Sequence, residues 1–156
     1  MINAVGRDIP EEILKATGKE VFQGVHHFDG HVYKKHGPEV ECGIKDGMTV
    51  SFHHHFREGD YVVNMVMKEI HDMGIKDITI CASSLGKAHD PLVEYIEDGT
   101  ITNIQSSGVR GKIGEAISNG KLKGLAIMRS HGGRVRALVT GETQIDIAFI
   151  GTPTCD

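Results

Sequence analysis

Residues 77–106, DITICASSLGKAHDPLVEYIEDGTITNIQS, decide which fold we expect from this chain. Two short apolar runs, 77–82 and 100–105, are typical of strands whose two faces are both covered. A helix is predicted between them over 91–98, because an Asp-Pro pair is typical of a helix start and Gly99 of a helix end. This order of strand, helix and strand predicts parallel strands with the helix packed on the sheet.

The same alternation continues on both sides of this unit. Further strands are predicted over 48–52, 124–130 and 145–151, and further helices over 61–73, 112–119 and 134–141. In the first of these helices, capped by Asp60, one apolar stripe is expected from Val62, Val66, Ile70 and Met73. Residues 46–156 are therefore predicted to form an α/β domain of three layers, α/β/α, with a mostly parallel sheet and helices on both sides.

Residues 1–45 differ from this domain because they show no sustained periodicity. One short helix is predicted over 10–17, with Pro10 in its first turn and Gly18 after its end. The rest is interpreted as an N-terminal leader or extension that lies on the domain or on a partner.

Composition excludes several classes of function. The net charge of −4, the aromatic content of 5% and the lack of a dense Lys/Arg stripe argue against nucleic-acid binding. No apolar run approaches the ~20 residues that span a bilayer, and the N-terminus does not have the pattern of a signal peptide. Three widely spaced cysteines without a C-x-x-C pair indicate reduced thiols and a cytoplasmic protein.

The carboxyl ends of the predicted strands differ in chemistry from the amino ends. The segments that follow the strands are HHHFREGD, SSLGKAHD, SSGVRG, SHGGR and GTPTCD, whereas the opposite turns are plain, such as MGIKD. Ligands of open parallel sheets bind beyond the carboxyl ends, beside helix N-termini. We therefore expect a site for an anionic ligand, held by backbone N–H groups and by Arg110, His131 and Arg134.

Each of these segments has a second, purely structural interpretation. The serines of the two Ser-Ser pairs, Ser83, Ser84 and Ser107 among them, can satisfy donors of turns and caps instead of a ligand. Gly132 and Gly133 can serve only to permit a positive φ. Arg110 can be a solvated loop cation.

Three consecutive histidines, His53 to His55, raise the question of a metal site. Neighbouring strand residues point to opposite faces, so His53 and His54 are poorly placed to share an ion. No H-x-x-x-H pattern lies in a predicted helix, and no cysteine pairs with a histidine, so we expect no metal. Instead, the loop from His53 to Phe56 is predicted to form one wall of the substrate site, with packing or turn roles as the alternative.

A set of motifs resembles the α subunit of bacterial citrate lyase, a relative of the coenzyme A transferases. The motifs are DGMTVSFHHHFREGD, NMVM, LVEYI, SHGGR and IDIAFIG, and they cover residues 46–156. Asp46-Gly47 keeps the place of the family's Asp-Gly, and His53–Phe56 occupies its glycine-loop positions with Gly59 still matching. Residues 1–45 look like the family's variable N-terminal stretch, and the domain is expected to have the coenzyme A transferase-like fold.

The resemblance implies a reaction on thioesters, in which citrate replaces acetyl on the phosphopantetheine-type arm of an acyl carrier protein. In this branch the citrate carboxylate is expected to attack the acetyl thioester directly. Such chemistry requires positioning and oxyanion stabilisation. His54 and His131 are the predicted catalytic donors. The predicted substrate contacts are His53, His55, Phe56, Ser83, Ser84, Ser107, Arg110, Gly132, Gly133 and Arg134.

The resemblance also implies partners. A β subunit that cleaves the citryl thioester and a γ subunit, the acyl carrier, are expected, together with citrate, an acetyl thioester and a homo-oligomer. No cofactor is expected to bind this chain itself. Family chains are roughly three times longer and continue into a second domain, so this chain is expected to be an N-terminal fragment that is inactive alone. The alternative is a stand-alone ligand-sensing or scaffold domain of the same fold.

Overall fold

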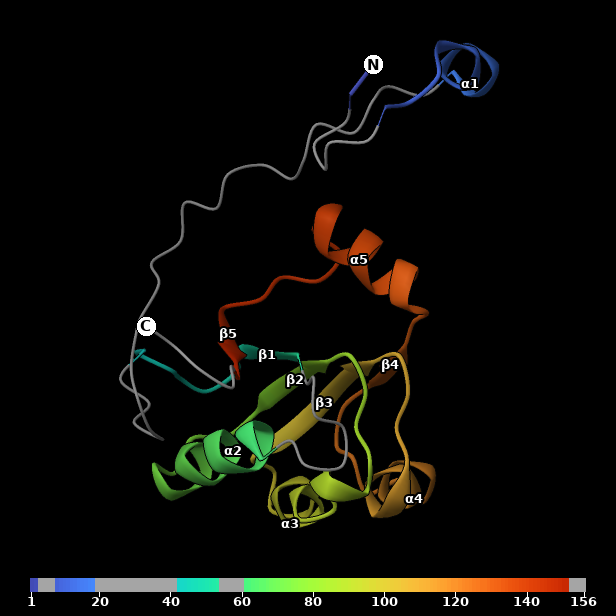
Figure 1. The fold of residues 1–156 in the computed structure, drawn as a ribbon. Helices are drawn as coiled ribbons and strands as arrows, with labels where there is room; N and C mark the ends of the chain where they lie inside the picture. The colour runs from blue at the N-terminus through green and yellow to red at the C-terminus, as the bar shows by residue number, and fades with distance from the viewer. Residues whose placement is uncertain (3–7, 19–41, 54–60, 152–156) are drawn as a thin grey trace. The chain divides into compact units, whose positions relative to one another are not determined.

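The computed structural model describes residues 1–2, 8–18, 42–53 and 61–151, and the chain divides into two units, Met1–Lys34 and Lys35–Asp156 (Figure 1). The first unit contains helix α1 (Glu11–Thr17), which confirms the helix predicted there. Pro10 stands at its N-cap, and Gly18 ends it in the left-handed conformation with φ of 60°.

The second unit contains the alternating elements that the sequence predicts. They are β1 (Thr49–His53), α2 (Val62–Asp72), β2 (Ile78–Ala82), the short 3₁₀ helix η2 (Lys87–His89), α3 (Leu92–Glu97), β3 (Ile101–Ser106), α4 (Gly111–Ser118), β4 (Ala126–Met128), α5 (His131–Val139) and β5 (Ile147–Ile150). Within the described residues the strands form one five-stranded sheet in the order β4-β3-β2-β1-β5. Every neighbouring pair is parallel, which confirms the predicted α/β class.

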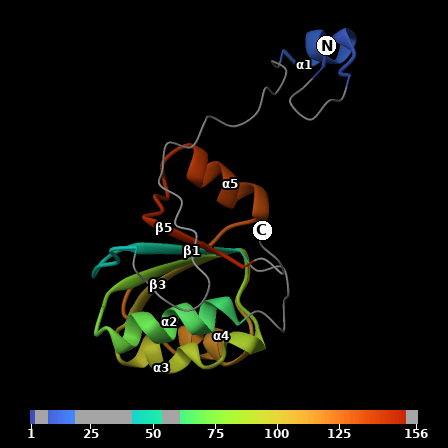
Figure 2. The same cartoon turned by 60° about the vertical axis from the view of Figure 1, so that its left-hand side comes forward.

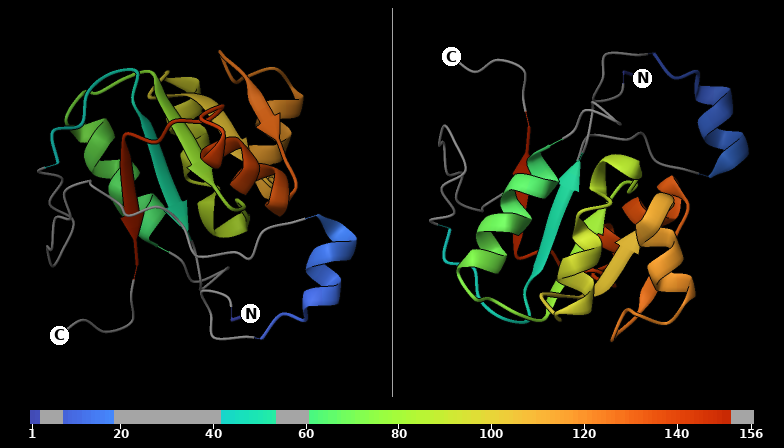
Figure 3. Two further views of the ribbon diagram at one scale, coloured as in Figure 1. Left: turned by 90° about the horizontal axis from the view of Figure 1, so that it is seen from above. Right: turned by 90° about the horizontal axis from the view of Figure 1, so that it is seen from below.

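The strand order explains why helices cover both faces. From β1 to β4 the chain steps in one direction across the sheet, and right-handed crossovers then place α2, α3 and α4 on one face. After β4 the chain returns to the far edge, so the same handedness places α5 on the opposite face. Figures 1 and 2 show these three layers, and Figure 3 shows the sheet from each side. We call the two sides of the sheet the α2 face and the α5 face.

The hydrophobic core lies on the α2 face. Val50, Phe52, Ile80 and Ile104 are almost fully buried there, and Phe52 stacks on Phe149 with ring centroids 5.6 Å apart. The buried residues of α2 are Val63, Val66, Met67 and Ile70.

The predicted apolar stripe of α2 was therefore wrong at its two ends. Met73 is 53% exposed and Val62 is half-buried. Val63, Val66, Met67 and Ile70 follow one another at the spacing of a single helix face, whereas Met73 caps the end of the helix. The predicted cap, Asp60, lies outside the described residues.

The α5 face of the sheet is polar. The strand register places Thr49 beside Thr79 and Thr79 beside Asn103. Two residues further along each strand, on the same face, the register aligns a second row of residues: Ala148, Ser51, Cys81, Gln105 and Ile127. The prediction that helices cover both faces is confirmed, but the strands are apolar on one face only. Each central strand instead alternates between apolar residues toward α2–α4 and small or polar residues toward α5.

Two boundaries near β4 also differ from prediction. β4 covers only Ala126–Met128, and α5 begins at His131 instead of residue 134. The Ser130 hydroxyl accepts a hydrogen bond from the Gly133 amide at 3.1 Å, which caps the helix three residues before its predicted start. Neither Gly132 nor Gly133 has a positive φ, so the alternative interpretation of these glycines was wrong as well.

Candidate functional site

All strands point the same way, so their carboxyl ends meet at one edge of the sheet. His53 is the last residue of β1 and is exposed there. His54, His55 and Phe56, which were predicted to form a wall of the site, lie outside the described residues. The described part of the candidate site is therefore built from the segments after β2, β3 and β4.

The segments after β2 and β3 lie side by side. The Leu85 amide donates to the carbonyl of Gly108 at 2.9 Å, and the Arg110 amide donates to the carbonyl of Leu85 at 2.9 Å. The Ser107 amide donates to the Ser83 carbonyl at 3.2 Å. The structure thus brings three of the predicted contact residues, Ser83, Ser107 and Arg110, to one place.

Ser106, the last residue of β3, and Ser107, which follows it, play different roles. Ser106 bonds the backbone of Gly108 in both directions, its hydroxyl donating at 3.0 Å and accepting at 3.2 Å, as in an ordinary turn. The Ser107 hydroxyl is buried and has no hydrogen-bond partner among the residues that the structure describes. A buried hydroxyl without a partner is costly, so Ser107 fits a ligand contact better than a turn donor.

The N-terminus of α4 is not available to an anion. The Lys112 amide donates to the Asp90 carboxylate at 2.8 Å. Gly111 has φ of 69°, and a Cβ placed there would meet the same carboxylate at 2.5 Å. This helix start is therefore already occupied by a carboxylate of the chain itself, and Arg110 at its N-cap is exposed.

Arg134 of α5 reaches down to the polar face of the sheet. Its Nη2 donates to the Ser51 hydroxyl at 3.2 Å and to the Cys81 carbonyl at 3.1 Å, and it lies 3.7 Å from the Cys81 sulfur. Its Nε is buried without a partner among the described residues. Among the residues that the structure describes, no carboxylate pairs with this guanidinium at the centre of the α5 face.

Arg136, on the same helix, differs from Arg134 because its charge is paired with a carboxylate of the chain. Both of its terminal nitrogens donate to the Glu142 carboxylate, at 2.6 and 3.0 Å, and its side chain is 62% exposed. The two arginines differ in direction, since Arg134 faces the sheet and Arg136 faces solvent. Of these two arginines, Arg134 is therefore the one suited to hold a carboxylate from a ligand.

His131 lies on the same side of α5 as Arg134, three residues earlier. Its side chain is exposed, and so is Gly132. Gly133 is half-buried against the cap, and a Cβ placed there would lie 3.1 Å from the Ser130 hydroxyl. Gly133 thus leaves room for the Ser130 cap, which starts α5 shortly after β4 and brings His131 close to the carboxyl ends of the strands.

The sequence did not predict the two residues that accept hydrogen bonds from Arg134. Ser51 and Cys81 lie inside predicted strands, where no contact residue was predicted. In the structure Cys81 is buried at the α5 face, where its backbone carbonyl and sulfur are close to a guanidinium. The alternation of polar and apolar residues in 49–53 was the signal that this face of the sheet is polar.

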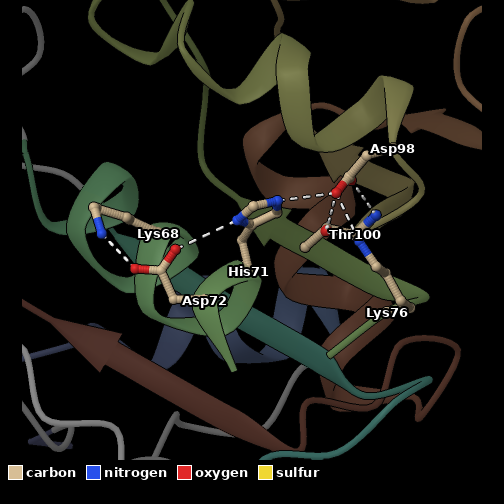
Figure 4. A network of polar contacts seen from close by, with 6 residues as sticks. All are labelled: Lys68, His71, Asp72, Lys76, Asp98 and Thr100. Carbon is tan, nitrogen blue, oxygen red and sulfur yellow. Dashed lines mark hydrogen bonds and ion pairs between the residues drawn. The ribbon is translucent and has the colours of Figure 1, made fainter. Parts of the chain in front are cut away.

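A second polar cluster lies at the amino ends of the strands, away from this edge (Figure 4). The Asp98 carboxylate accepts hydrogen bonds from the Lys76 ammonium at 2.6 Å and the Thr100 hydroxyl at 3.1 Å, and it lies 3.1 Å from His71. Partial burial acts to raise the pKa of Asp98, but the bonds from Lys76 and Thr100 outweigh it and lower the pKa to about 2. This arrangement is that of a structural ion network.

Neither a metal site nor a membrane helix is found in the described parts of the chain. No group of three or more His, Cys, Asp or Glu side chains is placed to hold an ion within these residues. Their helices also lack the length and apolar character that crossing a bilayer requires.

Comparisons with known proteins point to one family. The family model of the citrate lyase alpha subunit matches residues 37–156. Citrate lyase alpha chains from Haemophilus influenzae, Klebsiella pneumoniae and Escherichia coli are 55%, 52% and 54% identical over 114 residues, which is 73% of this chain. The chain spans only 22–23% of the length of these relatives.

One solved structure is similar as well. It is a crystal structure described as the alpha subunit of citrate lyase in complex with citrate, from Streptococcus mutans. The two chains are 46% identical with a TM-score of 0.71, and the match covers 97% of this chain and 32% of the other.

Proposed function

The chain belongs to the citrate lyase alpha subunit family, and we propose that it supplies the N-terminal part of an enzyme that exchanges acetyl for citrate on an acyl-carrier-protein thioester. In this proposal the chain works in a complex with the β subunit and the γ subunit, the acyl carrier, in the cytoplasm. The thioester on the carrier's phosphopantetheine-type arm is a substrate, and the chain itself needs no bound cofactor.

The observation that carries this proposal is the guanidinium of Arg134, which has no carboxylate partner in the part of the chain that the structure describes. Citrate is a tricarboxylate, so its recognition calls for cations that are not already neutralised by the protein. Arg134 has a buried Nε without a partner among the described residues and Nη2 held in place by Ser51 and Cys81. A guanidinium fixed in this way loses little freedom when it binds a carboxylate, which favours binding.

The other predicted site residues have definite roles in this proposal. His131 and His54 donate hydrogen bonds to the oxyanion that forms when a carboxylate attacks the thioester carbonyl. Ser107 contributes its buried hydroxyl to the ligand. The remaining substrate contacts are His53, His55, Phe56, Ser83, Ser84, Arg110, Gly132 and Gly133.

Citrate binding by the chain tests the proposal. A titration followed by NMR or calorimetry is expected to give a Kd in the millimolar to high-micromolar range, about −4 to −6 kcal/mol. Arg134→Ala should weaken binding by about 10- to 100-fold, because a charge-assisted hydrogen bond contributes roughly 1.5–3 kcal/mol.

The matched control is Arg136→Ala, which removes the same charge from the same helix. Arg136 faces solvent and pairs with Glu142, so this variant should bind citrate within about twofold of wild type. Equal loss in both variants would mean that general charge attracts citrate. No saturable binding by the wild-type chain would contradict the proposal.

A further inference from the structure

Helix α5 receives little stabilisation from apolar packing. Ala137 is its buried residue, whereas Val135 is 59% and Val139 is 77% exposed. The side of the helix that faces the sheet carries Arg134, and the sheet below it is polar. Because hydrophobic burial scales with the apolar area removed from water, something other than packing must hold α5 in place.

Polar contacts at the two ends of α5 meet at one side-chain atom of the sheet. The Gln105 Oε1 atom accepts a hydrogen bond from Arg129 Nη1 at 2.9 Å and another from the Thr143 hydroxyl at 2.7 Å. Arg129 directly precedes Ser130, the N-cap of α5, and Thr143 lies three residues after Thr140, the C-cap. A single oxygen on β3 thus ties both ends of the helix to the sheet.

Backbone hydrogen bonds add to the side-chain hydrogen bonds at both ends of α5. The Arg129 amide donates to the Ser106 carbonyl at the end of β3, at 2.9 Å. The Thr143 amide donates to the Ala137 carbonyl inside α5, at 3.0 Å, and Thr143 is only 5% exposed. Loss of the Gln105 oxygen would leave the buried Thr143 hydroxyl without its acceptor, and would leave the half-buried Arg129 guanidinium with its 3.9 Å ion pair to Glu142 but without this hydrogen bond, which is unfavourable.

The position of Gln105 connects this anchor with the candidate site. Gln105 is aligned with Cys81 across the sheet, and Cys81 is aligned with Ser51, so the anchor and the two residues under Arg134 form one row. The side chain of Gln105 is half-buried and already accepts two hydrogen bonds. It is therefore suited to hold other residues and not to contact a substrate.

We propose that Gln105 is a positioning residue whose side-chain oxygen holds both ends of α5 and thereby sets where Arg134 and His131 meet the substrate carboxylates. The part that concerns substrate rests on the proposed function. Gln105 acts through α5, so its loss loosens the helix and weakens citrate binding together.

Two substitutions of Gln105 test whether its side-chain oxygen, and not merely its volume, anchors α5. Gln105→Leu keeps the approximate volume but removes the acceptor oxygen, whereas Gln105→Glu keeps an acceptor for both donors. Hydrogen exchange of the amides of α5 and of α2 is measured in each variant, followed by citrate affinity. Gln105→Leu should raise exchange in α5 by about tenfold or more, leave α2 unchanged and weaken citrate binding by at least about tenfold. Gln105→Glu should keep hydrogen exchange in α5 close to wild type, because both donors still find an acceptor; its added negative charge near Arg134 makes the exchange, and not the citrate affinity, the measurement to compare.

The matched control is Asn103→Ala, two residues earlier on the same face of β3. The Asn103 side-chain oxygen accepts from the Leu125 amide at 2.9 Å and not from the segments that flank α5. This variant should raise exchange near Leu125 while α5 and citrate affinity stay unchanged. If Gln105→Leu does not fold, Thr143→Val and Arg129→Met each remove one donor and should each loosen α5.

Unchanged exchange in α5 after removal of the acceptor would overturn the proposal, whatever happens to citrate binding. Loss of affinity in Gln105→Leu with a rigid α5 would overturn it too, because Gln105 would then contact the ligand directly. If the wild-type chain binds no citrate, the proposed function fails, and the exchange measurement still decides whether Gln105 anchors α5.

Discussion

At the scale of single residues, Asp98 shows how one carboxylate can link three elements. It accepts from Lys76 before β2 and from Thr100 before β3, and it contacts His71 on α2. Its pKa in the folded protein, about 2, lies below the ordinary value of 3.8. A lowered pKa means that folding favours the charged form, so the stabilisation is complete above pH 3.8 and is lost as the pH falls toward 2.

We therefore expect Asp98→Asn to lower the melting temperature at pH 7 and to match wild type near pH 2. Melting curves by calorimetry between pH 2 and 7 would show the difference shrink below about pH 4. Asp72→Asn is the control. A hydrogen bond from Lys68 lowers the pKa of Asp72, but its side chain is 48% exposed against 30% for Asp98, so its effect should be smaller and more sensitive to salt. A difference for Asp98→Asn that does not depend on pH would contradict the assignment.

At the scale of elements, α5 has the reverse of the usual amphipathic arrangement. Its valines face solvent, and an arginine faces the sheet. An ordinary surface helix would place the valines toward the core. The reversal follows from the polar α5 face of the sheet, which offers partners to a guanidinium and none of the apolar surface that a valine needs.

This arrangement predicts opposite outcomes for two substitutions on α5. Val139→Lys should change the free energy of unfolding by less than about 0.5 kcal/mol, because the side chain is 77% exposed. Ala137→Leu should destabilise by about 1–3 kcal/mol, because Ala137 is only 1% exposed and a larger side chain has no room. Urea unfolding measures both values. A large cost for Val139→Lys would show that α5 packs through its valines after all.

At the scale of the whole molecule, the sheet has two edges that end in apolar side chains. β4 and β5 are the outer strands, and Leu125, Met128 and Ile150 are 67%, 49% and 69% exposed. Unpaired strand edges and exposed apolar residues promote association. The chain is therefore expected to form dimers or larger species.

Sedimentation velocity over a range of concentrations tests this expectation. Ile150→Lys charges the β5 edge and Leu125→Lys the end of the sheet beside β4, so at least one of them should shift the population toward monomer. The comparison of the two variants identifies the edge that associates. A wild-type chain that stays monomeric at high concentration would contradict the expectation.

The sequence by itself determined the order of strands and helices and the parallel α/β class. Both follow from local signals, such as the apolar runs of 77–82 and 100–105 and the cap residues around 91–98. It also placed Ser107 beyond the carboxyl end of a strand, as the parallel sheet requires. Arg134 was predicted in the same kind of segment, but in the structure its guanidinium contacts Ser51 and Cys81 on the α5 face. The start of α5 was missed, since Ser130 caps through a hydrogen bond that the pattern did not distinguish from a loop.

Only the tertiary structure decided which partners the site residues have. Arg134 lies 83 and 53 positions from Ser51 and Cys81, and Gln105 joins Arg129 and Thr143 across 24 and 38 positions. The register of neighbouring strands brings Ser51, Cys81 and Gln105 into one row, and no local pattern carries that register. The physical reason is that periodicity reports which face of a strand is apolar, whereas the contacts of the polar face depend on which distant segments the sheet aligns.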